Sequence, residues 1–399
     1  MTTATLIGLI IAICSFILLF VARHQIYAVF VRHKKLVKYF FLYGVLVFIY
    51  SFFIAGSYGQ WRYLFTVYLP TLILPFFIII GGNKDAVQVV IRFLLYVGLP
   101  LSVILYFSEI GGMNDFSHYV GFLYLFLLLS PFLLPFKRVF LYALILVSVL
   151  SNIDNRSNIL NFSVVLLVIL AVHLFERKTL RRTFGFLRAF FLFAPLVLLL
   201  LGISGLFNVF KFGDTFSEVF SFSYKENETL LTRDTRTGIF KDALSAIDDR
   251  DAYLFGISAA GVYKTELVDV NDDYFDSLKG GRMGNEVGIL EYLLRGGLIY
   301  VVLTFLLYFY ASGLAIRRSN NIICMAIGVF IAFRWFFLFI ESQPTLNLVN
   351  LADFMMIGIC LSPALRTMND KEIRIFIRQA FRFNMSKKRS RRLVTENFQ

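Results

Sequence analysis

The chain has 399 residues, of which 58% are apolar and only 16% are charged, and its formal net charge is +13. Soluble domains carry about 25% charged residues, so this composition excludes an ordinary soluble protein and predicts an all-α polytopic membrane protein. The three cysteines all fall in apolar stretches and only four histidines are present, so we expect no disulfide, no metal site and no cofactor.

Eleven apolar stretches are expected to form membrane-spanning helices, since about 20 helical residues cross the hydrocarbon core. The first is long enough to stay in the membrane, so we do not expect it to be removed as a signal peptide. In chain order the predicted spans are residues 4–22, 38–55, 63–80, 87–107, 117–134, 138–150, 159–175, 189–207, 285–311, 321–340 and 348–364.

These spans divide the chain into four parts. A group of eight helices (1–207) comes first, and a polar loop domain (208–284) follows it. Three more helices (285–365) lead to a basic, amphipathic tail (366–399), in which an apolar stripe predicts a helix at the inner membrane surface. We find no internal repeat and no pair of interrupted spans in the sequence.

Basic residues set the expected orientation, because cytoplasmic connections of membrane proteins are rich in Lys and Arg. Residues 23–38 and 176–188 each carry five such residues, and the tail after Leu365 carries ten. The short connections that alternate with these along the chain, and are therefore expected on the other side of the membrane, carry only Arg62 and Arg156. We therefore expect an external N-terminus, a cytoplasmic C-terminus and an external, periplasmic loop domain.

The net charge divides in the same way. The loop domain holds nine Lys or Arg against fourteen Asp or Glu, a balance of −5, whereas the remainder of the chain is at +18. The basic excess therefore indicates attraction to anionic membrane lipids and not a nucleic-acid partner.

Three arginines near the expected external face are candidates to bind an anionic group. Arg156 stands where the seventh span opens, and a helix N-terminus attracts anions; the alternative is an interfacial arginine that meets lipid phosphate. Arg233 and Arg236 are one helical turn apart, ahead of an amphipathic helical pattern, and the guanidinium fork suits pyrophosphate. The alternative for this pair is salt bridges to neighbouring aspartates.

Ionisable residues also open the ninth span. Glu286, Glu291 and Arg295 fall within ten residues of one another, and such groups usually face a cavity or a partner. Glu286 is a candidate general base, or alternatively a carboxylate favoured by the helix dipole, and Arg295 is a further candidate for pyrophosphate. Deeper in the last spans, Arg334 and Asp353 are expected to have a structural role, either as a pair across the bundle or with Arg334 reaching towards Glu341.

Three short elements of this sequence resemble those of the bacterial O-antigen polymerases and O-antigen ligases. They are Arg156-Ser157 ahead of a span, Arg236-Thr-Gly-Ile-Phe240-Lys-Asp-Ala-Leu244 followed by Leu254-Phe-Gly256, and Glu286 followed by Leu290-Glu291 and Gly297. The ligases carry a histidine where this chain has Glu286, which favours the polymerases.

The resemblance implies a GT-C-like membrane glycosyltransferase with Arg236 and Glu286 in the catalytic site. Such an enzyme in the bacterial inner membrane moves a growing glycan from undecaprenyl pyrophosphate onto a new lipid-linked repeat unit. Its expected partners are that lipid-linked oligosaccharide, membrane lipids, a chain-length regulator and a flippase. Three alternatives remain: an O-antigen ligase-type transferase, a non-enzymatic polysaccharide transporter or flippase, and a non-catalytic assembly partner.

Overall fold

The computed structural model describes residues 35–107, 120–151, 156–203, 235–265, 281–341 and 344–381. These residues are helical except for turns and one short antiparallel ribbon, in which β1 (Tyr263–Lys264) pairs with β2 (Gly281–Arg282). The predicted first span and large parts of the predicted loop domain lie outside the described residues.

Six helical segments of the described chain are long and apolar enough to cross a membrane. Composition and helix length together therefore identify a helical membrane protein. The six segments are Lys35–Ile54, Tyr58–Gly82, Lys84–Ile104, Ser157–Leu174, Arg177–Leu201 and Gly288–Arg318.

Two of these segments, Tyr58–Gly82 and Lys84–Ile104, are divided into successive elements by π-helical turns. The N-terminal elements are α3 (Lys35–Ile54), α4 (Tyr58–Tyr63), η1 (Leu64–Tyr68), α5 (Leu69–Thr71), α6 (Leu74–Gly82), α7 (Lys84–Phe93), η2 (Leu94–Gly98) and α8 (Leu99–Phe107). The central elements are α10 (Leu123–Leu129), η3 (Ser130–Phe132), α11 (Pro135–Leu150), α12 (Arg156–Leu174), α13 (Arg177–Ile203) and α16 (Thr235–Asp248). The C-terminal elements are α18 (Gly288–Arg318), α19 (Ile322–Phe337), α20 (Leu348–Leu361), α21 (Pro363–Arg366) and α22 (Asp370–Ala380).

Most predicted spans differ from the structure by a few residues at their ends, and two of them differ in a way that has a clear physical reason. Within the described part of the predicted span 117–134, helix α10 ends at Leu129, because Pro131 lacks the N–H that would continue the helix and begins the turn η3 instead. Pro135 then begins α11. Helix α13 begins at Arg177, well before the predicted start at residue 189. Its first turns are rich in Arg and Lys, which are good helix formers even though they lie outside the apolar stretch.

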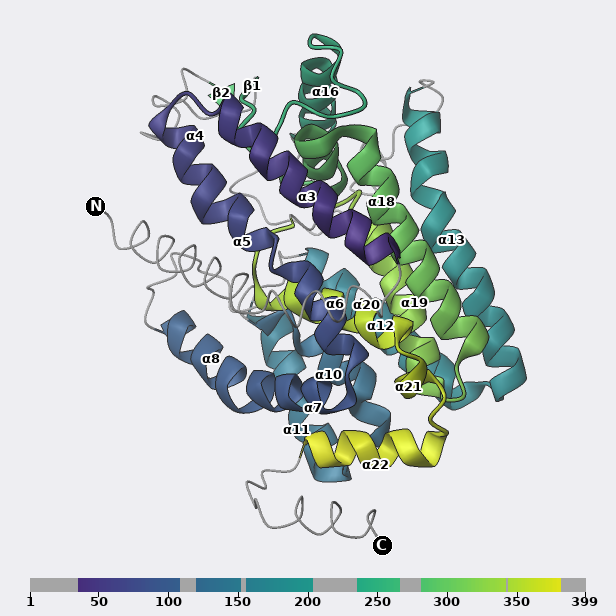
Figure 1. Ribbon diagram of the computed structural model, residues 1–399. Coiled ribbons are helices and arrows are strands. Elements are labelled where there is room, and N and C mark those ends of the chain that lie inside the picture. Colours follow the sequence, from purple (N-terminus) through teal and green to yellow (C-terminus); the bar gives the residue numbers. More distant parts are fainter. Residues whose placement is uncertain are drawn as a thin grey trace, which may run out of the picture.

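The core of the bundle forms around α19, whose side chains are nearly all buried. This helix packs against α18, α13, α20 and α12 (Figure 1). Beside it, α6 and α20 cross closely at two glycines, Gly81 and Gly358. A Cβ atom at Gly358 would lie 2.1 Å from the carbonyl oxygen of Ile78, so only a glycine permits this approach of the two backbones.

The amphipathic tail helix is confirmed as α22, but its apolar face is covered by protein. Ile373, Phe376 and Ile377 are buried where α22 packs against α7, α19 and η3. Figure 1 shows α22 at one end of the bundle, and α16 and the β1–β2 ribbon at the opposite end. The described loop-domain elements and the tail helix are therefore separated by the length of the bundle.

Candidate functional site

Helix α18 is interrupted in its first half. Gly296 has φ −143° and ψ 17°, and Gly297 has φ 65° and ψ −165°, so neither residue is helical although the helix continues on both sides. A positive φ is readily adopted only by glycine. The expectation of uninterrupted spans is therefore wrong here, because a glycine pair inside an apolar run does not show in the sequence whether the helix bends or breaks.

The segment that follows α16 packs into this break. The backbone N–H of Leu298 donates to the carbonyl of Tyr253 at 2.8 Å, and the N–H of Ile257 donates to the carbonyl of Leu294 at 2.7 Å. These bonds satisfy backbone groups that the break leaves without a helical partner. The approach is tight: Gly256 has φ 70°, and a Cβ there would lie 2.5 Å from the Leu294 oxygen.

Two sequence elements that carry the family resemblance thus lie in direct contact. The Leu254-Phe-Gly256 element lies against Gly297, since a Cβ on Gly297 would come within 2.3 Å of the Leu254 backbone. The contact joins the described part of the predicted loop domain to the ninth predicted span.

A buried ion pair precedes the break. Glu291 and Arg295 are one helical turn apart on α18 and form a salt bridge, with side-chain exposures of 0% and 3%. The hydroxyl of Tyr63 donates to Glu291 Oε1 at 2.8 Å and accepts from the Arg295 guanidinium at 3.0 Å. The guanidinium also lies 5.0 Å from the ring centroid of Tyr68. Charge and aromatic faces together hold Arg295 against the segment Tyr58–Gly82.

The pair keeps some hydrogen-bonding capacity. Arg295 donates a long bond, 3.4 Å, to the carbonyl of Pro344. Its Nε and the Oε2 atom of Glu291 are buried without a hydrogen-bond partner among the described residues. Buried polar atoms are usually bonded, so this site is polar and incompletely satisfied.

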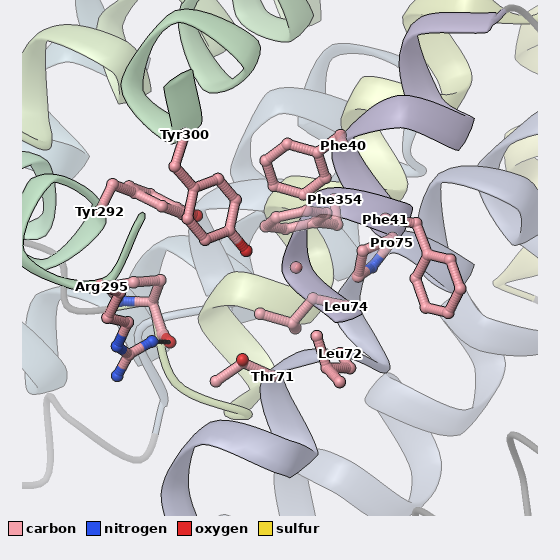
Figure 2. Close-up of a pocket in the computed structure, with 12 residues that line it drawn as sticks. Phe40, Phe41, Thr71, Leu72, Leu74, Pro75, Tyr292, Arg295, Tyr300 and Phe354 are labelled. Atoms are coloured by element: carbon pink, nitrogen blue, oxygen red, sulfur yellow. Dashed lines mark hydrogen bonds between the residues drawn. The ribbon is translucent and has the colours of Figure 1, made fainter. Parts of the chain in front are cut away.

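A hollow lined mainly by aromatic and apolar side chains adjoins Arg295. Figure 2 shows the Tyr300 hydroxyl directed into it, with Phe40 and Phe354 on one side and Thr71 on the opposite side. The rings of Phe40 and Tyr300 lie 5.4 Å apart. The lining residues come from α3, the segment Leu69–Gly82, α18, Pro344 and α20. The hollow is therefore built from helices that are far apart in the sequence.

Glu286 lies outside this buried group. Its side chain is 70% exposed and pairs with Arg282 at 2.9 Å, ahead of the start of α18. As expected from their spacing, Glu286 and Arg295 do not pair with each other. The partner of Arg295 is Glu291, and the sequence carries a signal for this pair, because a Glu four residues before an Arg on a predicted helix indicates an ion pair.

The other candidate arginines are only partly described. Arg156 is the first residue of α12, which confirms its predicted place at the start of a helix. Arg236 lies in the first turn of α16, which confirms the helix predicted there. The side chains of both, and the whole of Arg233, lie outside the described residues. On α16, Ala243 and Ile247 are buried and form part of the predicted apolar face.

Buried hydrogen bonds also hold the residues that lead into the first turn of α18. The Tyr263 hydroxyl donates to the carbonyl of Gly284 at 2.9 Å and accepts from Asn285 Nδ2 at 3.2 Å. Burial raises the pKa of Tyr263 to about 12, so this hydroxyl stays protonated at neutral pH. Asn285 Oδ1 in turn accepts from the N–H of Val287 at 2.9 Å, which ties the ribbon to the start of the helix.

A second buried pair joins the last helices. Arg334 Nε donates to Asp353 Oδ2 at 2.7 Å, which confirms the predicted cross-bundle pair. Arg334 also donates to Asn161 at 2.9 Å, and Tyr124 donates to Asp353 at 2.8 Å. Four helices, α10, α12, α19 and α20, therefore meet at one polar network.

Comparison with protein-family models, curated proteins and solved structures finds no match to this chain. A function therefore has to follow from the residues of the chain and from their geometry. The broken helix α18, the loop segment packed into it and the adjacent buried charges are the features that bear on it.

Proposed function

We propose that this protein is a polysaccharide polymerase of the O-antigen or capsule type. It would transfer a growing glycan from undecaprenyl pyrophosphate onto a new lipid-linked repeat unit at the outer face of the bacterial cytoplasmic membrane. The proposal includes eleven spans in a GT-C-like arrangement, an external loop domain 208–284, an external N-terminus and a cytoplasmic C-terminus.

The observation that supports it most is the contact between Gly256 and the break at Gly297. Both glycines belong to the elements that resemble the polymerase family, and positive φ angles at both make the contact specific to glycine. An external loop whose backbone packs into the break in α18, next to the Glu291–Arg295 ion pair, is suited to enclose substrates that arrive through the lipid.

In the proposed reaction an acceptor sugar hydroxyl attacks the anomeric carbon of the donor. A new C–O bond forms there, the bond to the lipid pyrophosphate breaks, and the hydroxyl proton passes to Glu286. Its exposed side chain is accessible for this role as general base. Undecaprenyl pyrophosphate leaves with the bonding electron pair.

Negative charge develops on the departing pyrophosphate, and fixed positive charge stabilises it most where it builds up. We assign this role to Arg156, Arg233 and Arg236. Arg295 is already paired with Glu291 inside the bundle, so we give it a positioning role: it holds the helix break to which the loop is attached.

One observation favours a transporter or flippase as the second candidate. Transporters place binding sites at discontinuous membrane helices, with buried ionisable groups beside them. Helix α18 has such a discontinuity next to Glu291 and Arg295. A ligase-type transferase would instead differ from a polymerase by making a single transfer.

The deciding experiment uses the purified protein in proteoliposomes with one lipid-linked repeat unit, and the products are resolved by length. A polymerase gives a ladder of lengths, and a ligase with an added acceptor gives one product. A flippase moves the substrate between leaflets without changing its length. Unchanged length together with translocation would overturn the proposed polymerase in favour of the second candidate.

A further inference from the structure

Basic side chains converge where the C-terminal end of α22 meets the turn between α10 and α11. Two of them contact Phe132 in that turn. Arg378 Nε donates to the Phe132 carbonyl at 3.2 Å, and the guanidinium of Arg374 lies over the Phe132 ring, 5.3 Å from its centroid. Both arginines are exposed on α22, so their remaining donors face outward.

Three more cations complete this group, which we call the foot cluster. Lys137 Nζ donates to the carbonyl of Phe381 at 2.5 Å, where the C-terminal end of α22 attracts positive charge. Arg92 and Arg138 also donate to main-chain carbonyls, at 3.1 and 3.2 Å. The foot cluster therefore consists of Arg92, Lys137, Arg138, Arg374 and Arg378.

Within the part of the chain that the structure describes, no carboxylate neutralises the foot cluster. None of its members forms an ion pair within the described residues, because their partners are neutral carbonyls and a ring. The acidic residues of α22 have other partners: Asp370 accepts from the N–H of Ile322, and Glu372 accepts from that of Asn369. Five positive charges thus lie together, and no carboxylate of the described residues pairs with them.

Exposed apolar side chains adjoin the same cations. On α11, Phe136 is 83% exposed beside Lys137, and Val139 is 66% exposed beside Arg138. On α22, Ile375 is 58% exposed between the two arginines of that helix. Cations bordered by exposed apolar side chains match a molecule that has an anionic head and an apolar tail.

We propose that the foot cluster binds the head group of an anionic phospholipid. The guanidinium groups of Arg374 and Arg378 donate to the phosphate oxygens, since the arginine fork fits phosphate. Lys137 adds charge from α11, and the acyl chains lie along Phe136 and its apolar neighbours. Lipid binding would then fasten α22 to the bundle, a role that does not depend on the proposed enzymatic activity.

The test uses the full-length protein in detergent, with lipid binding followed by native mass spectrometry and thermal unfolding. Phosphatidylglycerol is compared with phosphatidylcholine, and inorganic phosphate is a separate arm. Each cation near an anionic surface contributes about 1 kcal/mol. The Arg374→Gln/Arg378→Gln variant should therefore bind phosphatidylglycerol roughly 30-fold more weakly.

Lys371→Gln is the matched control, because Lys371 is a basic residue of α22 outside the foot cluster, and this variant should bind like the parent protein. Arg374→Gln alone is the second variant if the double variant does not fold, since the contact described for Arg374 is with an aromatic ring and not with the main chain. Equal binding of both lipids, equal stabilisation by inorganic phosphate, or an equal loss in Lys371→Gln would each overturn the proposal.

Discussion

Glu291 and Arg295 form an ion pair that has almost no contact with solvent, directly before the break in α18. Moving two charges out of water costs several kcal/mol per ion, and the attraction repays this only with good geometry and further hydrogen bonds. The Tyr63 hydroxyl supplies both a donor and an acceptor to the pair. The pair therefore fixes the first half of α18 against the end of α4.

Arg295→Met should destabilise the protein by about 3–5 kcal/mol, because it leaves the Glu291 carboxylate buried and unpaired. The double variant Glu291→Met/Arg295→Met should recover much of this loss, since no lone charge remains. Chemical unfolding in detergent measures both. Glu286→Gln is the control: its carboxylate is 70% exposed, and an exposed ion pair contributes only about 0–1 kcal/mol. Equal stability of single and double variants would contradict this account of the pair.

Gly297→Ala should destabilise the protein by at least about 1–3 kcal/mol through its backbone conformation alone. The added carbon would also come within 2.3 Å of the Leu254 backbone and force the loop segment away. Thermal unfolding and protease sensitivity of residues 250–265 report the two effects. Gly185→Ala is a matched control, since this helical glycine has open space around it. A parent-like stability for Gly297→Ala would show that the break does not require glycine.

Asp353→Leu should also cost about 3–5 kcal/mol, because Arg334 would lose its buried carboxylate. If the role of the pair is structural, the double variant Arg334→Met/Asp353→Leu should be more stable than Asp353→Leu and should still form glycan polymer. Unfolding measurements on the parent, both single variants and the double variant give the coupling energy. Loss of polymer from a stably folded double variant would instead assign the pair to the reaction.

Much of the helical architecture could be predicted from local sequence patterns. The start of α12 at Arg156, the helix after Arg236 and the tail helix all follow from apolar spacing and helix-start chemistry. The Arg334–Asp353 pair could be predicted because an ionisable group inside an apolar span needs a partner, and few are present.

What could not be predicted depends on contacts between distant segments. The apolar stripe of α22 has the same sequence pattern whether lipid or protein covers it. In the structure α7 and α19 cover it. The break in α18 depends on the segment around Gly256 reaching it, which no local pattern records. The Glu291–Arg295 pair has a sequence signal in its spacing, but its burial depends on Tyr63 from another helix.

If Arg236 holds the departing pyrophosphate, its geometry matters as well as its charge. Arg236→Lys keeps the charge but loses the planar fork that donates two parallel hydrogen bonds. We expect polymerisation to fall by about 10²-fold or more, the loss seen when one donor to a developing anion is removed. The rate of ladder growth from one lipid-linked repeat unit measures this effect.

Arg250→Lys is the matched control for Arg236→Lys, because it makes the same chemical change within the predicted loop domain. Arg250 donates to the Val262 carbonyl and has no assigned role in the reaction, so its variant should retain the parent rate. Arg156→Ala and Arg236→Ala together should abolish polymer, since two of the three proposed pyrophosphate ligands are lost. Parent-like chain lengths from that double variant would exclude the proposed stabilisation of the departing pyrophosphate by Arg156 and Arg236.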